Sequence, residues 1–213
     1  EDSPIRSLAD LKGKKVGMSP AGSSTATIAA AVLAGNHGLA EKDFALVPGN
    51  EARLVQFLAQ REVDAAALRN VTVAQIRDLK LRTLSTFAEE WRKLSGSDGA
   101  PYNAVGAVRA DYLEKNPDAV VRSIVALRKA LERGQAQPDE VTGAVRKAAN
   151  LPEESARVFA DLWRENYRVS LTAADQQTLK REFEIFKANG TLKGELPASA
   201  LDPAPYEKSL AIR

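Results

Sequence analysis

The sequence contains no cysteine and one histidine, His37. The absence of cysteine excludes disulfide bonds, thiolate metal sites and cysteine nucleophiles. His37 follows a helical pattern in a glycine-flanked turn, where the helix dipole favours a cation. No Ser-His-Asp spacing and no second type of metal ligand accompany it. We therefore expect a surface histidine, no catalytic residue, no metal and no bound cofactor.

Aromatic residues are also scarce, at 6% of the chain, and charges of one sign are not gathered. The 30 Lys and Arg residues are scattered among 28 Asp and Glu residues, for a formal net charge of +2. Without a basic stripe or aromatic stacking platforms, nucleic acid is not an expected partner. The longest apolar run, Ile28–Ala34, falls far short of the roughly 18 residues that a membrane span needs.

Over residues 1–102, short apolar runs alternate with helical patterns, which implies parallel strands in an α/β sheet. These strand candidates are at 15–19, 44–47 and 63–68, with a further one at 81–86. Beyond a turn-rich stretch at 95–101 and a last strand candidate at 103–109, the chain is almost wholly helical. Helices are expected over 116–133, 138–149, 151–166 and 173–188, followed by a loop-like tail. The sequence thus predicts an α/β fold with one parallel-sheet part, 1–102, and a largely helical part, 103–213.

The stretch after the first apolar run reads Ser-Pro-Ala-Gly-Ser-Ser-Thr and leads into an Ala-rich helix expected over 24–34. Such a loop aims backbone N–H groups, hydroxyls and the positive end of a helix dipole at one point, which suits an anion or a polar ligand head. The alternative is that Ser23 or Ser24 only caps the helix, which accounts for one hydroxyl. A phosphate-binding loop is excluded because Ser23 stands where its lysine belongs. The candidate ligand-binding residues are Ser19, Gly22, Ser23, Ser24 and Thr25.

A second candidate is the pair Arg69-Asn70, which we expect to end the third strand. The carboxyl ends of parallel strands share one edge of a sheet, so these residues should face the hydroxyl loop. An arginine offers planar, bidentate recognition of a carboxylate, sulfonate or phosphate. The alternative is a surface arginine held in a local ion pair.

Further notable residues are expected to have structural roles. Glu89 and Glu90 are neighbours on a helical pattern, so their side chains diverge, and we interpret them as a solvated helix start rather than a glycosidase pair. Trp91 is expected to pack rather than to line a cleft. Three aromatic residues at a spacing of four are expected on one helix, facing the core or a partner surface: Phe159, Trp163 and Tyr167.

An ordered set of motifs resembles a known family. Residues 5–17, Ile-Arg-Ser-Leu-Ala-Asp-Leu-Lys-Gly-Lys-Lys-Val-Gly, are similar to the "sl-DLKGK-kVg" segment of solute-binding proteins of ABC importers, in the nitrate, sulfonate and taurine group that is also called NMT1-like. Each motif is weak alone, but the set covers nearly the whole chain. The motifs that follow in the same order are Gly22–Thr25, Pro48–Arg53, Val63–Ala65, Asn116–Asp118, Leu171-Thr172, Leu201-Asp202 and Tyr206–Lys208.

The resemblance implies a periplasmic-binding-protein type 2-like fold, in which two α/β lobes close over a small ligand. Residues 1–102 would form the second lobe, and residues 103–213 the mostly helical C-terminal part of the first. In the family the segment like 5–17 lies well inside the chain, so this chain is expected to lack the N-terminal part of its first lobe. The helical half, with one strand candidate, would then lack a sheet to pack on.

By position, the resemblance places the loop 19–25, Asn50 and the end of the third apolar run on the second lobe's side of the ligand cleft. Where the family often has an aromatic residue and a proline after its Asp-Ala pair, this chain has Leu68, Arg69 and Asn70. That departure leaves the type of ligand open.

The resemblance implies a receptor without enzymatic activity, periplasmic or anchored outside the cell membrane, that delivers a small polar or anionic ligand to an ABC permease. The alternatives are an enzyme on the same fold, such as a menaquinone-pathway-like lyase, and a ligand-sensing domain. Thiamin-pyrimidine synthases of the same group use a segment rich in Cys and His, which is absent here. Two copies could also complement each other's missing sheet as a homodimer.

Overall fold

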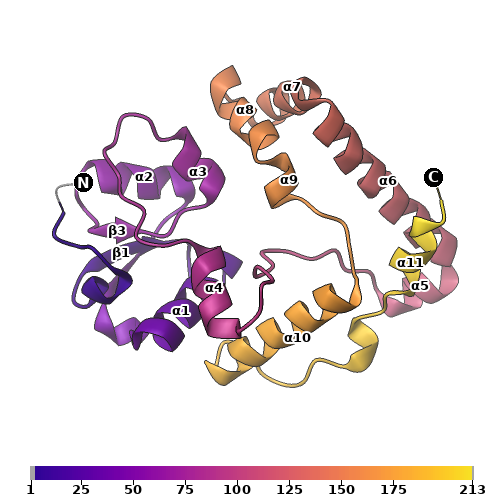
Figure 1. Ribbon diagram of the computed structural model, residues 1–213, viewed down its shortest axis with the longest axis horizontal. Coiled ribbons are helices and arrows are strands. Elements are labelled where there is room, and N and C mark those ends of the chain that lie inside the picture. The colour runs from indigo at the N-terminus through magenta and orange to yellow at the C-terminus, as the bar shows by residue number, and fades with distance from the viewer. Residues whose placement is uncertain (1–2, 213) are drawn as a thin grey trace. The chain divides into compact units, whose positions relative to one another are not determined.

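The computed structural model describes residues 3–212 and divides them into two compact units (Figure 1). The sheet unit comprises the residues up to Val105 together with Gln176–Leu196, and the helical unit comprises Gly106–Asp175 together with the residues from Pro197. The chain therefore leaves the sheet unit, returns to it for one helix, and leaves it again.

Three short strands form a parallel sheet in the order β2-β1-β3. They are β1 (Lys15–Met18), β2 (Ala45–Pro48) and β3 (Ala65–Ala66). Strand β1 is central, with Val16 opposite Leu46 of β2 and Ala65 of β3. The expected α/β class with a parallel sheet is confirmed, because helices connect consecutive strands.

Each strand of the sheet unit is followed by a helix, and further helices complete the unit. The helices of this unit are η1 (Leu8–Leu11), α1 (Ser24–His37), η2 (Glu41–Asp43), α2 (Glu51–Ala59), α3 (Asn70–Gln75) and α4 (Phe87–Ser95), joined by α10 (Ala173–Ala188) from Gln176 onward. Helix α1 extends beyond the expected residue 34 because Gly38, not Gly35, adopts the left-handed conformation that ends it, with φ of +63°.

Helix α1 is apolar on two sides, and both are buried. Leu33 joins a cluster with Val16 and Met18 of β1, whereas Ile28 joins a second cluster around Trp91 of α4. Trp91 is fully buried, so the expectation that it packs is confirmed. Helix α10 closes the second cluster with Phe186, whose ring centroid lies 5.9 Å from that of Trp91. Helix α1 is thereby fixed between the sheet and a layer of two further helices.

Helix α2 approaches the end of β1 closely through Leu54, which is fully buried. A Cβ atom on Gly17 or on Gly49 would lie 3.0 Å from Leu54 Cδ2, closer than ordinary van der Waals contact. Glycine at these two positions therefore sets how near the start of α2 lies to the carboxyl end of the central strand.

Three expected strands differ from the structure. The run at 63–68 pairs only at Ala65–Ala66, and 81–86 and 103–109 contain no strand. Residues 103–108 are exposed, and within the described part of the chain their backbone groups make no hydrogen bond to one another or to a neighbour. Their valines suit a strand, but a strand forms only where a neighbouring strand accepts and donates the ladder bonds.

The helical unit consists of α5 (Ala110–Lys115), α6 (Pro117–Ala136), α7 (Pro138–Ala149), α8 (Glu153–Asp161), α9 (Trp163–Asn166), η3 (Ala198–Ala200) and α11 (Ala204–Leu210). The helix expected over 151–166 is interrupted at Leu162, so Phe159 and Trp163 lie on different helices and Tyr167 follows the second. The tail is not wholly loop-like, because α11 packs on α6. Arg128 of α6 donates to the carbonyl oxygen of the fully buried Ser209 at 2.8 Å.

Candidate functional site at the carboxyl edge of the sheet

All three strands of the sheet end at one edge. Because β1 pairs in parallel with both neighbours, Met18, Pro48 and Ala66 lie at the same side of the sheet. Each strand then enters a short loop and a helix, and the three helices begin after Ser23, Asn50 and Arg69. Every residue singled out from the sequence as a ligand-binding candidate belongs to one of these three connections.

The loop after β1 is a tight turn that ends in a helix cap. Ser23 N donates to the Pro20 carbonyl at 3.1 Å, and Gly22 has φ of +86°, which favours glycine. Ser23 Oγ accepts from Ala26 N at 3.2 Å, so this hydroxyl caps α1. The capping alternative therefore holds for Ser23.

Capping does not use the other hydroxyls of this loop. Among the described residues, no hydrogen bond involves the side chains of Ser19, Ser24 or Thr25. Ser24 is exposed, and Ser19 and Thr25 are half-buried. Three hydroxyls and the first N–H groups of α1 thus stay available beside the end of the central strand as potential hydrogen-bond donors.

Asn50 begins α2 at the end of β2. Its Oδ1 atom accepts from Arg53 N at 3.0 Å, and the preceding Gly49 N donates to the Met18 carbonyl at 3.0 Å. The side-chain oxygen of Asn50 is thus engaged as a helix cap, while its exposed amide nitrogen makes no hydrogen bond among the described residues. Asn50 could donate to a ligand but not accept from one without losing the cap.

Arg69 lies after β3 and is tied to the start of α2. Its backbone N donates to Glu51 Oε2 at 3.2 Å, and its Nε lies 3.5 Å from Glu51 Oε1. The local ion pair is present, with the arginine side chain 55% exposed. Sequence reasoning missed Glu51, although an acidic residue in the first helical turn after a neighbouring strand was a signal for such a partner.

Asn70 requires a correction. It was expected to end the third strand, but it is the first residue of α3, and its Oδ1 accepts from Val71 N at 2.9 Å. The paired register with β1 covers Ala65 and Ala66, and the last hydrogen bond to β1 runs from Ala67 N to the Gly17 carbonyl at 2.9 Å, before Arg69 and Asn70 are reached. Arg69 and Asn70 are therefore parts of a helix start rather than of a strand end.

Taken together, this edge offers hydroxyls, helix-start N–H groups, one amide nitrogen and one guanidinium that already has a carboxylate partner. Such groups are of the kind that can hold a polar or anionic ligand, and among the described residues of this edge no nucleophile is paired with a base. Within residues 3–212, no group of three or more His, Asp and Glu side chains is arranged to hold a metal ion.

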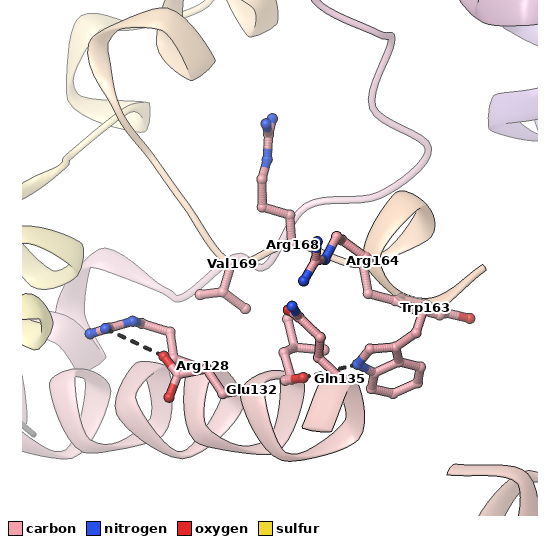
Figure 2. Close-up of a pocket in the computed structure, with 9 residues that line it drawn as sticks. Arg128, Glu132, Gln135, Trp163, Arg164, Arg168 and Val169 are labelled. Atoms are coloured by element: carbon pink, nitrogen blue, oxygen red, sulfur yellow. Dashed lines mark hydrogen bonds and ion pairs between the residues drawn. The ribbon is translucent and has the colours of Figure 1, made fainter. Parts of the chain in front are cut away.

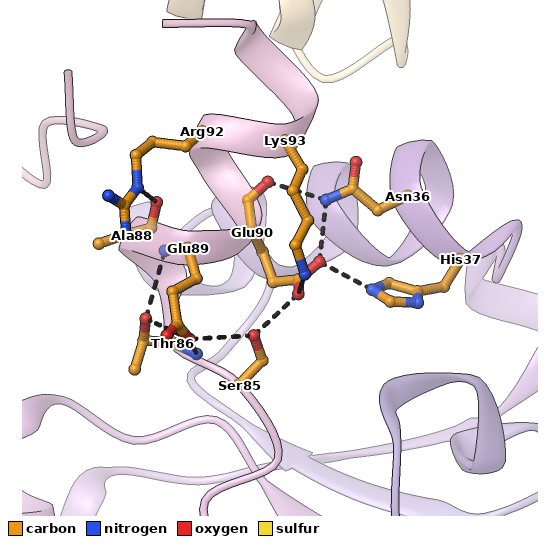
Figure 3. A network of polar contacts seen from close by, with 9 residues as sticks. All are labelled: Asn36, His37, Ser85, Thr86, Ala88, Glu89, Glu90, Arg92 and Lys93. Atoms are coloured by element: carbon orange, nitrogen blue, oxygen red, sulfur yellow. Dashed lines mark hydrogen bonds and ion pairs between the residues drawn. The ribbon is translucent and has the colours of Figure 1, made fainter. Parts of the chain in front are cut away.

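A separate polar cluster joins the end of α1 to α4 (Figure 3). Glu90 was expected to be solvated, but its side chain is 4% exposed. Its carboxylate accepts from Lys93 Nζ at 2.7 Å, Ser85 Oγ at 2.8 Å and Asn36 Nδ2 at 2.9 Å. Burial acts to raise the pKa of Glu90, but these hydrogen bonds and that with His37 lower it to about 2.

The expectations for His37 and Glu89 can be compared with the contacts around Glu90. His37 is the last residue of α1, and its Nε2 lies 2.8 Å from Glu90 Oε2, so it is a half-buried partner of a carboxylate and not a free surface side chain. Glu89, in contrast, is exposed and forms a capping box with Thr86 at the start of α4. This cluster links α1 to α4 and involves none of the residues at the strand ends.

None of the described helices is both long enough and apolar enough to cross a lipid bilayer.

The chain is 24% identical over 212 residues to proteins of Brucella abortus, Brucella suis and Brucella melitensis that are provisionally named binding proteins. The match covers 95% of this chain and 61% of each relative. The chain thus spans about six tenths of the length of the curated relatives it matches.

Solved structures resemble the fold. The periplasmic aliphatic sulphonate-binding protein SsuA from Escherichia coli matches with a TM-score of 0.71 and 21% identity, over 95% of this chain and 63% of that one. SsuA from Methylobacillus flagellatus matches with a TM-score of 0.63 and 19% identity, over 99% and 63% of the two chains. At these identities the likeness shows the periplasmic-binding-protein fold, of which this chain covers part.

The same fold also occurs in an enzyme. The desulfurization enzyme DszB matches with a TM-score of 0.66 and 16% identity, over 99% of this chain and 74% of that one.

Family membership follows from the sequence itself, because the NMT1/THI5-like family model matches residues 1–141. The protein belongs to the NMT1/THI5-like family.

Proposed function

We propose that the protein binds a small polar or anionic organic solute at the carboxyl edge of its sheet, as the solute-binding component of an ABC importer. The observation that carries this proposal is that three strand ends share one edge of the sheet, where the connections carry the uncommitted hydroxyls of Ser19, Ser24 and Thr25 and the side chains of Asn50 and Arg69. Family membership and the likeness to SsuA support it.

The finer parts of this proposal follow from the same family. The ligand belongs to the sulfonate, nitrate or taurine class, the protein works in the periplasm or anchored outside the membrane, and a membrane permease receives the ligand. Residues 1–102 would be the second lobe and 103–213 the helical part of the first. An organic sulfonate would accept hydrogen bonds from the hydroxyl loop and meet the guanidinium of Arg69.

The test uses a panel of ethanesulfonate, taurine and nitrate, titrated into the protein by isothermal calorimetry. For the panel member that binds, the Ser24→Ala/Arg69→Ala double variant should bind more weakly by about tenfold or more, because a charge-assisted and a neutral hydrogen bond are lost. Arg77→Gln, a matched loss of one exposed charge in the same unit, serves as the control. Equal affinity in the double variant and the control would contradict the site assignment.

Glu51 provides a second arm for the same experiment. Its carboxylate lies 3.5 Å from Arg69 and would repel an anion placed there. Glu51→Gln should therefore strengthen binding of an anion by a few-fold while leaving a neutral ligand unaffected.

An enzyme on the same fold is the second candidate, favoured by the likeness to DszB. It predicts that a bound ligand is recovered chemically changed. Mass spectrometry of the ligand after incubation with the protein distinguishes the two, since a receptor returns the ligand intact.

A further inference from the structure

The helical unit contains a surface pocket between α6 and the segment that follows α8 (Figure 2). One wall is a single face of α6, with Arg128, Leu131, Glu132 and Gln135 at helical spacing. The other wall is made by α9 and the residues that follow it, including Trp163, Arg164 and Tyr167. All lining residues belong to the helical unit, so the pocket is separate from the sheet edge described above.

The aromatic wall is fixed in place by α6. Trp163 Nε1 donates to the Leu131 carbonyl at 3.0 Å, and the indole lies against Gly134, where a Cβ atom would come within 2.6 Å of the ring. Tyr167 stacks on it at a tilt, with the ring centroids 4.8 Å apart. A wall that is already ordered costs little entropy when a ligand settles against it.

The charges around the pocket leave one guanidinium without an acidic partner. Arg128 lies 3.8 Å from Glu132, and Arg168 binds the buried Asp175 at 2.8 Å, with its side chain directed away from α6 (Figure 2). Arg164 points toward α6 (Figure 2), where its Nε donates at 2.9 Å to the side-chain oxygen of Gln135 once the amide of Gln135 is turned over, the orientation that satisfies both its oxygen and its nitrogen. Among the described residues, the guanidinium of Arg164 meets no carboxylate.

The pocket has room for one small ring. Its volume is about 160 Å³, close to that of a cavity of about 150 Å³ that accommodates one benzene ring. A guanidinium favours a planar oxyanion, and an aromatic wall favours a flat apolar body.

From these observations we propose that this pocket binds a small organic anion with one flat ring, whose carboxylate or related oxyanion faces Arg164 while the ring lies against Tyr167. The site is independent of the ligand site proposed at the sheet edge. It would give the helical unit a binding activity of its own.

Benzoate is the probe, and benzamide is the neutral ligand of the same shape. The two tryptophan indole N–H signals report binding in ¹H–¹⁵N spectra of the whole chain, assigned with the Trp163→Phe variant. Benzoate should shift the Trp163 signal in a saturable way and leave that of the fully buried Trp91 unchanged. Benzamide, which lacks the negative charge, and inorganic phosphate, which lacks the ring, should each bind at least about tenfold more weakly than benzoate.

Arg164→Gln should weaken benzoate binding about tenfold, whereas Arg122→Gln, on the exposed part of α6, should have no effect. Arg69→Ala, which tests the sheet edge, should also leave the Trp163 shift unchanged. Equal binding of benzamide, equal binding of phosphate, or equal weakening by Arg122→Gln would overturn the proposal. So would the absence of any saturable shift of the Trp163 signal when benzoate is titrated into the unmutated protein.

Discussion

Glu182 is a buried carboxyl, and among the described residues no cation pairs with it. It is 6% exposed, and its Oε2 accepts from Tyr102 N at 3.1 Å. Burial raises the pKa of Glu182 from 4.5 to about 7, and the hydrogen bond from Tyr102 offsets only part of that rise. The folded protein therefore binds a proton at pH values where the unfolded chain has already released it.

This difference makes stability depend on pH in a defined direction. The contribution of protonated Glu182 is fully present below pH 4.5 and is lost as the pH rises to about 7. The loss amounts to about 3 kcal/mol in the free energy of unfolding. Glu182→Gln keeps an acceptor for Tyr102 N but cannot ionise, so urea titrations should show it more stable than the wild type at pH 8 and similar at pH 5.

Glu90 supplies the internal control, because its pKa is shifted the other way. Its stabilising contribution is present above pH 4.5 and is lost as the pH falls toward 2. Glu182→Gln should retain that acid-side loss while the neutral-side loss disappears. If the free energy of unfolding falls equally in the variant and the wild type between pH 5 and pH 8, Glu182 is not the group that causes this pH dependence.

At the scale of single elements, the sequence patterns identified helix starts more accurately than strand lengths. Helix α10 covers 173–188 as expected, and Asn50 and Ser23 cap helices as their residue types indicate. The runs at 81–86 and 103–109 did not become strands. A helix completes its hydrogen bonds within itself, whereas a strand depends on a partner elsewhere in the chain.

Helix α6 offers a test of how its contact with α9 is built. Gly134→Ala raises helix propensity by about 1 kcal/mol, but its Cβ would meet the rigid Trp163 indole at 2.6 Å. We expect a net loss of about 1–3 kcal/mol in the free energy of unfolding, measured by urea denaturation.

Gly143→Ala on α7 is the matched control, since a Cβ there meets nothing within 4 Å. It should stabilise the protein by about 0.5–1 kcal/mol, the propensity gain alone. Similar stabilisation by both substitutions would mean that Trp163 does not pack on α6 at Gly134.

At the scale of the whole molecule, the two units differ in what they bury. The largest fully buried apolar side chains, Trp91, Met18, Ile28 and Leu54, belong to the sheet unit. The buried apolar residues of the helical unit are valines and alanines, namely Val121, Val125, Val141, Ala156, Val158 and Ala160. Because burial of apolar area contributes roughly 25 cal/mol per Å², the helical unit should be the less stable one.

One tryptophan lies in each unit, so the units can be followed separately without mutation. In protein labelled with fluorotryptophan, ¹⁹F spectra recorded across a urea series should show the Trp163 signal reaching its unfolded position at a lower urea concentration than the Trp91 signal. Coincident transitions would show instead that both units unfold as one cooperative body.

The formation of a homodimer, and the assignment of residues 1–102 and 103–213 to two lobes, stay predictions.

The sequence by itself determined the local architecture: strands followed by capped helices, the clustering of candidate ligand residues at strand ends, and family membership. These depend on residues close together in the chain, whose patterns and caps act within a few positions. Only the tertiary structure decided that Arg69 pairs with Glu51, that Glu90 and Glu182 are buried, and that Trp163 completes a pocket on α6. Those outcomes depend on which distant residues packing brings together, and neither periodicity nor composition records that.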